Sequence, residues 1–162
     1  MKLFKTLLTI LFISLLSSPS WSVTGDDLVY RNDLYYEKFT NVPFSGEVTG
    51  QEQGSFKNGK RDGAWVFYWS NGQLESKGNF EHGKREGHWV FYWSSGELSY
   101  KGNYENGFRE GAWVGYHVNG QLSWKGNYKN SQHEGFWVSY EENGTVQKRL
   151  TGTFKDGVKI SD

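Results

Sequence analysis

One stretch of the chain recurs at a fixed spacing, and this constrains the fold more than any other feature of the sequence. Residues 63–82 read GAWVFYWSNGQLESKGNFEH, and residues 87–106 and 111–130 repeat this pattern closely. A fourth copy begins at residue 135 with GFWVSYEENGTV. The copies begin with glycines 24 residues apart, namely Gly63, Gly87, Gly111 and Gly135. A fixed period of this length is typical of a repeat architecture, in which each unit packs on its neighbours.

Each copy predicts a β-hairpin. In the first copy we expect a leading strand over residues 64–69, a turn over 70–73 and a return strand over 74–81. Residues 82–87 are then expected to connect to the next copy. Asn71 and Gly72 separate two strand-like runs, and both residue types tolerate a positive φ. No stretch has a sustained 3.6-residue apolar period, so no helix is predicted after the N-terminal segment.

These units predict an all-β protein, an elongated antiparallel meander of hairpins in a single sheet. It has four clear 24-residue repeats and divergent caps. Residues 1–22 are expected to be a signal peptide, 23–53 an N-terminal β cap, and 54–162 the repeat array. The cap contains a predicted hairpin, with strands over 28–31 and 34–37 around Asn32 and Asp33, and a further strand that begins near Pro43. The last copy has extra residues at 147–151, where a bulge is expected, and a final cap strand over 154–162.

The N-terminal segment has the layout of a secretory signal peptide. Lys2 and Lys5 precede an uncharged apolar run over 6–16, and the small residues Ser20 and Ser22 follow it. The run is short for a membrane span, which needs roughly 20 apolar residues. An uncleaved anchor and a core helix are the alternatives. We therefore expect export, to the periplasm or to the medium.

Composition and charge exclude several classes of function. The 18 Lys and Arg residues balance 18 Asp and Glu residues, so no basic surface for nucleic acid is indicated. The absence of cysteine excludes disulfides, thiolate metal sites and cysteine nucleophiles. The four histidines fall at four different repeat positions, so no metal site is predicted. No catalytic or cofactor-binding motif is present. The sequence therefore predicts no enzyme, no catalytic residue and no cofactor.

Two stretches at the starts of copies resemble a known family. Residues 57–65 read KNGKRDGAW and residues 81–89 read EHGKREGHW. This pattern resembles MORN repeats, in the bacterial variant often described as antitoxin-like. The resemblance implies an elongated, twisted antiparallel meander that has binding or scaffolding roles with protein or phospholipid partners.

Most repeat positions are interpreted as structural. The tryptophans Trp65, Trp89, Trp113 and Trp137 occur in every copy, as do the leading glycines, and cross-strand packing explains them. Charged residues also recur. We interpret them as a solvated face of alternating sign, with an anion-binding ladder for lipid headgroups or acidic glycans as the alternative. These charged positions are Lys77/101/125, Arg61/85/109 with His133, and Asp62, Glu86, Glu110 and Glu134.

Positions that change between copies are freer to carry a specific function. Aromatic residues occupy several of these positions on the side of the sheet expected to hold the tryptophans, and one contiguous patch is predicted to bind a partner. The alternative is that the sheet curls and buries these side chains as its own core. The patch residues are Phe67, Trp69, Phe91, Trp93, Tyr100 and Trp124.

The sequence therefore predicts an exported, non-enzymatic repeat protein that binds or scaffolds a protein or a cell-envelope component, including a lipid headgroup or a glycan. A structural element that self-associates through its sheet ends is one alternative, because edge strands readily pair with other chains. An antitoxin-like or immunity-like role is the other, and it comes from the family resemblance alone.

Overall fold

The computed structural model describes residues 22–162, so nearly all of the predicted signal peptide lies outside the described residues. Within them the chain forms one short 3-10 helix, Gly25–Asp27, and antiparallel β-strands. No helix in residues 22–162 is long and apolar enough to cross a membrane. The strands are β1 (Leu28–Arg31), β2 (Leu34–Glu37), β3 (Gly46–Val48), β4 (Glu52–Lys57), β5 (Lys60–Tyr68), β6 (Leu74–Glu81), β7 (Lys84–Tyr92), β8 (Leu98–Glu105), β9 (Phe108–Tyr116), β10 (Leu122–Lys129), β11 (Gln132–Ser139), β12 (Gly152–Lys155) and β13 (Val158–Ser161).

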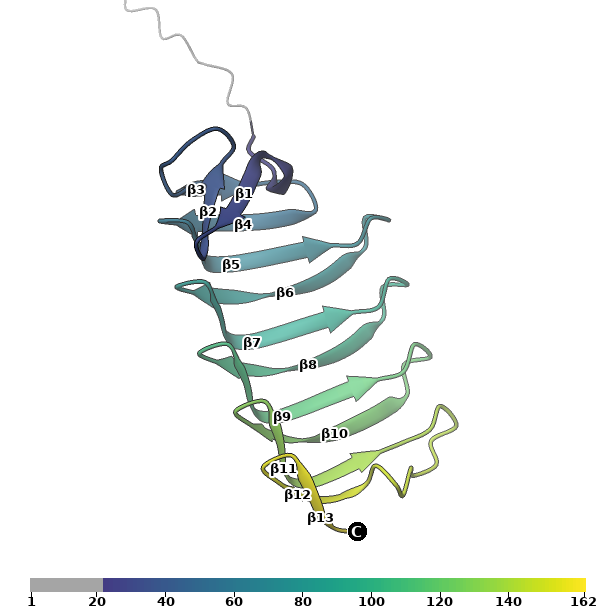
Figure 1. Cartoon of the computed structure of the whole chain (residues 1–162). Helices are drawn as coiled ribbons and strands as arrows, with labels where there is room; N and C mark the ends of the chain where they lie inside the picture. Colours follow the sequence, from purple (N-terminus) through teal and green to yellow (C-terminus); the bar gives the residue numbers. More distant parts are fainter. Residues whose placement is uncertain (1–21) are drawn as a thin grey trace, which may run out of the picture.

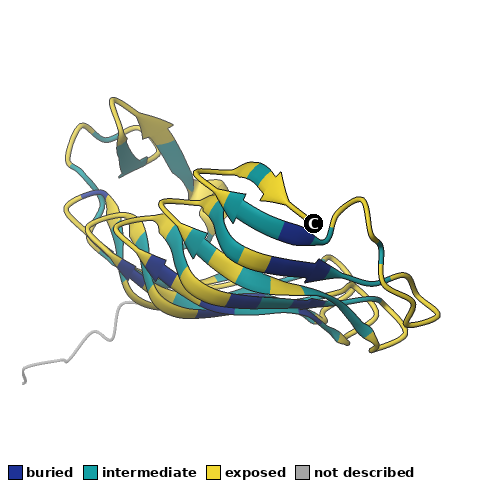
Figure 2. Ribbon diagram, turned by 90° about the horizontal axis from the view of Figure 1, so that it is seen from below, coloured by how far each residue is buried: buried dark blue, intermediate teal, exposed yellow. Residues whose placement is uncertain are grey.

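The strands from β3 to β13 pair in sequence order and form one 11-stranded open sheet. Figure 1 shows the resulting elongated stack of hairpins, with the separate β1–β2 hairpin lying across the β3–β5 end. The strands bend along their length, so the sheet is curved (Figure 2). The predicted all-β hairpin meander is confirmed.

Tight turns join the repeats, and here the predicted connection was wrong. His82 and Gly83 have φ values of 51° and 85°, which suit a two-residue hairpin turn of the I′ kind. The chain re-enters the sheet at once with β7, so the polar run that follows Gly83 is strand rather than linker. For the same reason β5 begins four residues before the predicted start of the leading strand, at Lys60, and ends at Tyr68.

The turns at the other end of each hairpin are longer. Only Gly72 has a positive φ there, 83°, so the expectation that Asn71 would share this conformation was wrong. Asn71 contributes through its side chain instead. Its Oδ1 accepts a hydrogen bond from the Gln73 N–H at 3.0 Å, and its Nδ2 donates to the Ser94 carbonyl of the next hairpin at 2.7 Å. The turn is therefore tied to the following repeat.

The two caps differ in how well they were predicted. β1 and β2 have the predicted bounds, and Asn32 and Asp33 between them have φ values of 50° and 60°. The single final strand expected over 154–162 was wrong, because the chain turns at Asp156 and Gly157 and forms β12 and β13. The expected bulge at 147–151 was also wrong, since these residues lie in turns and connecting chain outside the strands.

The tryptophans of the four repeats form the core of the sheet. Trp65, Trp89, Trp113 and Trp137 are at most 3% exposed. We call the side of the sheet that carries them the tryptophan face. Each ring lies on a glycine of the preceding strand. A Cβ added to Gly78 would be 2.3 Å from Cδ2 of Trp89. The Trp89 indole N–H also donates to the Asn79 carbonyl at 3.0 Å.

The leading glycines serve a different purpose. Around Gly87 the pairing between β6 and β7 shifts, because Lys77 pairs with Val90 while Asn79 pairs with Glu86. Gly87 lies in this bulge with a φ of 64°, and an added Cβ would meet nothing within 4 Å. The position needs glycine for its backbone conformation rather than for space.

The contact between Gly78 and Trp89 predicts a specific coupling. Gly78→Ala should lower the free energy of unfolding by about 1–3 kcal/mol, because the methyl group overlaps the indole ring. In a Trp89→Leu background the same change should cost clearly less, which urea denaturation of the four proteins measures.

Gly63→Ala is the matched control, because its φ of 79° is strained for alanine while its surroundings are open. Its cost, about 1–2 kcal/mol, should be the same in both backgrounds. An equal cost of Gly78→Ala with and without Trp89 would contradict the proposed role of the ring.

Candidate functional site

Four of the six predicted patch residues pack together on the tryptophan face. Phe91 is a core residue, 7% exposed, and Phe67, Tyr100 and Trp124 are half-buried against the core. The rings of Phe91 and Tyr100 stack at 4.3 Å, and those of Tyr100 and Trp124 lie 6.4 Å apart. These rings are therefore partly core and partly surface.

The structure places Trp69 and Trp93 elsewhere. They follow the ends of β5 and β7, and within residues 22–162 no aromatic pair joins either of them to the other four. Their indole N–H groups donate to the carbonyls of Tyr92 at 3.3 Å and Tyr116 at 3.2 Å. His117 has the same contact with the Tyr140 carbonyl, at 2.9 Å. This column therefore ties each hairpin to the next.

The arginine column lies on the tryptophan face, which the sequence reasoning missed. The guanidinium carbons of Arg61, Arg85 and Arg109 lie over the rings of the tryptophan four residues later. The distances to Trp65, Trp89 and Trp113 are 4.8, 4.7 and 4.8 Å. Such cation–π contacts are attractive, more so where the cation is shielded from water. The constant spacing of four residues from Arg to Trp could have predicted these contacts. The spacing was not used, because the arginines were assigned to turns rather than to strands.

The recurring acidic residues, which we call the acidic column, do not neutralise these arginines. The interpretation as a face of alternating charges implied that they would. The column consists of Asp62, Glu86, Glu110 and Glu134. Glu86 accepts a hydrogen bond from the backbone N–H of Asn106 at 2.9 Å, and Glu110 accepts one from Asn130 at 2.9 Å. Glu134 accepts from Asp156 in the same way. These carboxylates therefore hold the tight turns between later strands.

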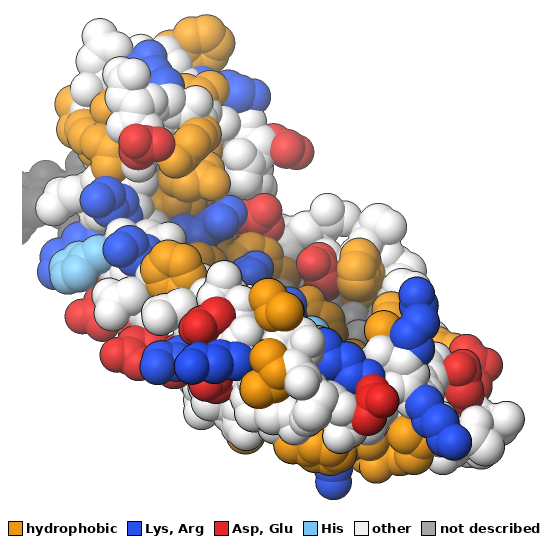
Figure 3. Space-filling view, turned by 60° about the horizontal axis from the view of Figure 1, so that its bottom comes forward, with side chains coloured by type: hydrophobic (Ala, Val, Ile, Leu, Met, Phe, Trp, Pro, Cys, Tyr) orange, Lys and Arg blue, Asp and Glu red, His pale blue; other side chains and the backbone are white. Residues whose placement is uncertain are grey.

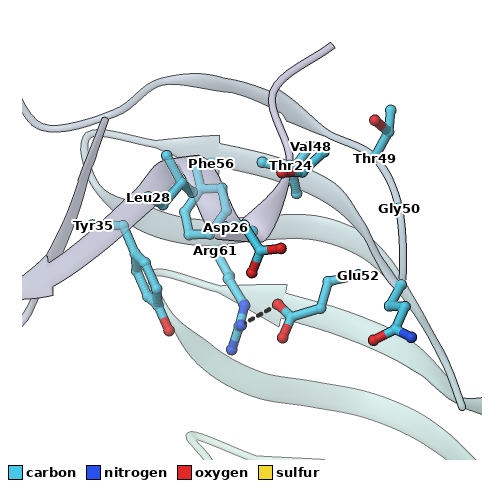
Figure 4. A pocket seen from close by; sticks show the side chains of 12 residues that line it. Thr24, Asp26, Leu28, Tyr35, Val48, Thr49, Gly50, Glu52, Phe56 and Arg61 are labelled. Carbon is cyan, nitrogen blue, oxygen red and sulfur yellow. Dashed lines mark hydrogen bonds and ion pairs between the residues drawn. The ribbon is translucent and has the colours of Figure 1, made fainter. Parts of the chain in front are cut away.

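Arg61 differs from the other two arginines in its partner. Its Nη2 lies 2.6 Å from the Glu52 carboxylate, and Figure 4 shows the two side chains pointing toward one another. Arg85 and Arg109 instead donate to the hydroxyls of Tyr104 at 3.4 Å and Tyr128 at 3.0 Å. Within residues 22–162 neither has a carboxylate oxygen within 4 Å. Two half-buried cations of this face therefore have only neutral partners.

Two cavities lie along this face. One, of about 390 Å³, lies between the N-terminal segment and the sheet, where Leu28, Tyr35 and Phe56 surround Arg61 (Figure 4). The other, of about 280 Å³, extends from Arg61 to Arg85. The first lies near the lower end of the usual range for ligand sites, about 300–1,000 Å³, and the second lies just below it.

The lysine column lies on the opposite side of the sheet. Lys77 pairs in register with Val66 and Val90, so these three side chains share a face. Each valine directly follows a tryptophan, and successive residues of a strand point to opposite faces, so this face is the one opposite the tryptophans. Figure 3 shows basic and acidic side chains interspersed over the surface in view. Residues 22–162 contain no group of three or more His, Asp or Glu side chains suited to a metal ion.

Burial and neighbouring charge shift the pKa of several groups here. Burial raises the pKa of Tyr100, which keeps its phenol neutral. Burial lowers the pKa of Arg109, but the surrounding tyrosines outweigh this effect and the net pKa is raised, so the guanidinium stays charged. His133, at the end of the arginine column, stacks on Trp137 at 3.8 Å. Its pKa is lowered first by burial and then by Arg109.

The His133 environment predicts a pH-dependent stability. The fold disfavours the protonated ring, so below neutral pH the unfolded chain binds more protons than the folded one. The free energy of unfolding therefore reaches its full value only above the ordinary histidine pKa of about 6.5. It should decline as the pH falls from there through the lowered folded pKa. His133→Gln should flatten this decline, measured as urea midpoints between about pH 7.5 and 5. His88→Gln, at an exposed position, is the control, and an unchanged slope in His133→Gln would contradict the prediction.

Comparisons with known proteins address the repeat itself. The family described as MORN repeat variant matches residues 61–82 and 85–106. No curated protein matches the chain. Among solved structures, a chain of the "Crystal structure of GtfA/B complex bound to UDP and GlcNAc" is similar at 13% identity and a TM-score of 0.25. The match covers 85% of this chain and 25% of that one, so this chain spans about a quarter of the length of its match. The chain therefore contains two repeats that match the MORN repeat variant family, and they lie within an 11-stranded hairpin sheet.

Proposed function

We propose that the protein is a non-enzymatic binding module that holds an acidic protein or cell-envelope component on its tryptophan face. The observation that carries this proposal is the pair Arg85 and Arg109, half-buried and without a carboxylate within 4 Å in residues 22–162. A guanidinium removed from water gains most from a charged, bidentate acceptor. A partner's carboxylate or other acidic group would supply one.

The surroundings of the arginines support the same proposal. Tyr100 and Trp124 are half-buried on this face, and their exposed parts provide apolar contact beside the charges. Tyr and Trp with Arg are the residues that most often dominate binding energy at interfaces. The proposal includes export, with residues 1–22 as a cleaved signal peptide, because two lysines, an apolar run and small residues follow one another there in the order of such a peptide.

Capture from envelope and culture-fluid extracts of the source organism tests this function. We expect Arg85→Gln/Arg109→Gln to retain the partner at least about tenfold less well, since each lost charged hydrogen bond is worth about 1.5–3 kcal/mol. Lys77→Gln/Lys125→Gln, which removes two charges from the opposite face, should bind normally. Circular dichroism of each variant checks its fold.

The remaining outcomes are also decisive. A partner that both double variants retain equally would overturn the proposal for the tryptophan face. Trp69→Ser/Trp93→Ser tests the two predicted patch residues that lie at the turns. If it loses the partner while the arginine variant keeps it, the binding surface is at the turns instead.

Self-association is a second candidate, favoured by the C-terminal edge of the sheet. β13 pairs only with β12, and it exposes Val158 and Ile160 by 66% and 61%. An unprotected apolar edge strand is a template for pairing with another chain. Light scattering of the native protein should then show a mass that rises with concentration, and Ile160→Lys should reduce it to that of a monomer. A native protein that remains monomeric would exclude this role.

A further inference from the structure

The repeats carry one position whose residue changes in every copy and which faces the arginine column. By the 24-residue period, Glu52 corresponds to Ser76, Tyr100 and Trp124. Strand pairing agrees, because Glu52 pairs with Phe67 just as Ser76 pairs with Phe91. Counted from Glu52, which precedes the repeat that begins at Gly63, the first to fourth copies of this backbone site therefore hold four different side chains next to equivalent members of the arginine column.

The first copy shows which group fits this site. There the Glu52 carboxylate lies 2.6 Å from Nη2 of Arg61. In the third copy the Tyr100 ring takes this place, 5.4 Å from the Arg109 guanidinium. The second copy has only the short side chain of Ser76, which is buried, and the cavity of about 280 Å³ lies between it and Arg85.

We propose that this cavity is a carboxylate-binding pocket, in which a ligand's carboxylate meets Arg85 as the Glu52 carboxylate meets Arg61. The inference rests on the proposed function and names the group that the tryptophan face recognises. Phe67 and Phe80 line the cavity and would contact the aliphatic stem of the ligand. The volume suits a glutamate side chain of a partner protein or a short aliphatic acid.

The charges around the cavity define the specificity further. Arg61 and Glu52 neutralise one another at one end, and Arg85 faces the other. Glu75 also lines the cavity and has no basic nitrogen within 4 Å in residues 22–162. It repels an anion, so Glu75→Gln should tighten binding of a carboxylate. A neutral amide has no ion pair to gain here and should bind much more weakly.

Titration with propionate, followed by NMR of the arginine side-chain N–H groups, tests the pocket in the native protein. We expect the Arg85 signal to shift and saturate, and Arg85→Gln to lose this response. Propionamide should produce no comparable shift. Acetyl-Gly-Glu-Gly-amide and its glutamine counterpart form a second arm. A response to the glutamate peptide assigns the pocket to a side chain, and a response to propionate alone assigns it to a free acid.

Two variants use the repeats as their own control. Ser76→Glu places in the second copy the residue that the first copy has, so it should abolish the response to propionate and raise Tm above that of Ser76→Gln, which has nearly the same size. Glu52→Ser makes the reverse change and should create a second response, at Arg61. If Ser76→Glu still binds propionate at Arg85, the pocket is overturned.

The pocket and the broader function fail separately. If Arg85 responds neither to propionate nor to the glutamate peptide, the proposed pocket is overturned. This holds even where Arg85→Gln/Arg109→Gln loses the captured partner. The broader function is overturned only by a partner that this double variant still retains.

Discussion

The contact of a tryptophan ring with a glycine of the preceding strand underlies the rest of the structure. A single-layered sheet has no second layer to cover its apolar side, so it must bury its own large side chains. Removing Cβ at Gly78 lets the Trp89 ring lie against the backbone. The ring is then completely buried although nothing but its own sheet surrounds it. Each repeat thus supplies the cover for the next, which explains why terminal units must differ.

This packing also determines where charge can lie. With each indole flat against the sheet, its outer surface is available to the guanidinium of Arg61, Arg85 or Arg109. The ring's negative face partly compensates for the water that the cation loses. The carboxylates of the acidic column are engaged by backbone N–H groups at the turns and do not reach these cations. On the tryptophan face Arg85 and Arg109 are therefore left without a carboxylate oxygen within 4 Å in residues 22–162.

The sequence predicted the meander because hairpins are local, and β6 has the bounds expected for the return strand. It failed at the tight turns, where His82-Gly83 alone reverses the chain and the polar run after it reads like a loop. This error moved Arg85 from the sheet to a turn and concealed its contact with Trp89. The patch was predicted in part, since Phe67 and Phe91 follow the alternation of β5 and β7 while Trp69 and Trp93 lie beyond the strands. The role of Ser76 depends on the Arg61–Glu52 distance, which no sequence pattern gives.

Repetition makes one position of the fold informative, because the backbone stays constant while the side chain changes. Glu52 neutralises its arginine, Ser76 leaves a cavity, and Tyr100 covers the cation with a neutral ring. Arg61 has the Glu52 carboxylate at 2.6 Å, whereas Arg85 has no carboxylate oxygen within 4 Å in residues 22–162. The copy that has Arg85 without a carboxylate is therefore the one in which an external acid gains the most. Stability and recognition depend on the same arginine column, and the residue at this one position decides which of the two each copy provides.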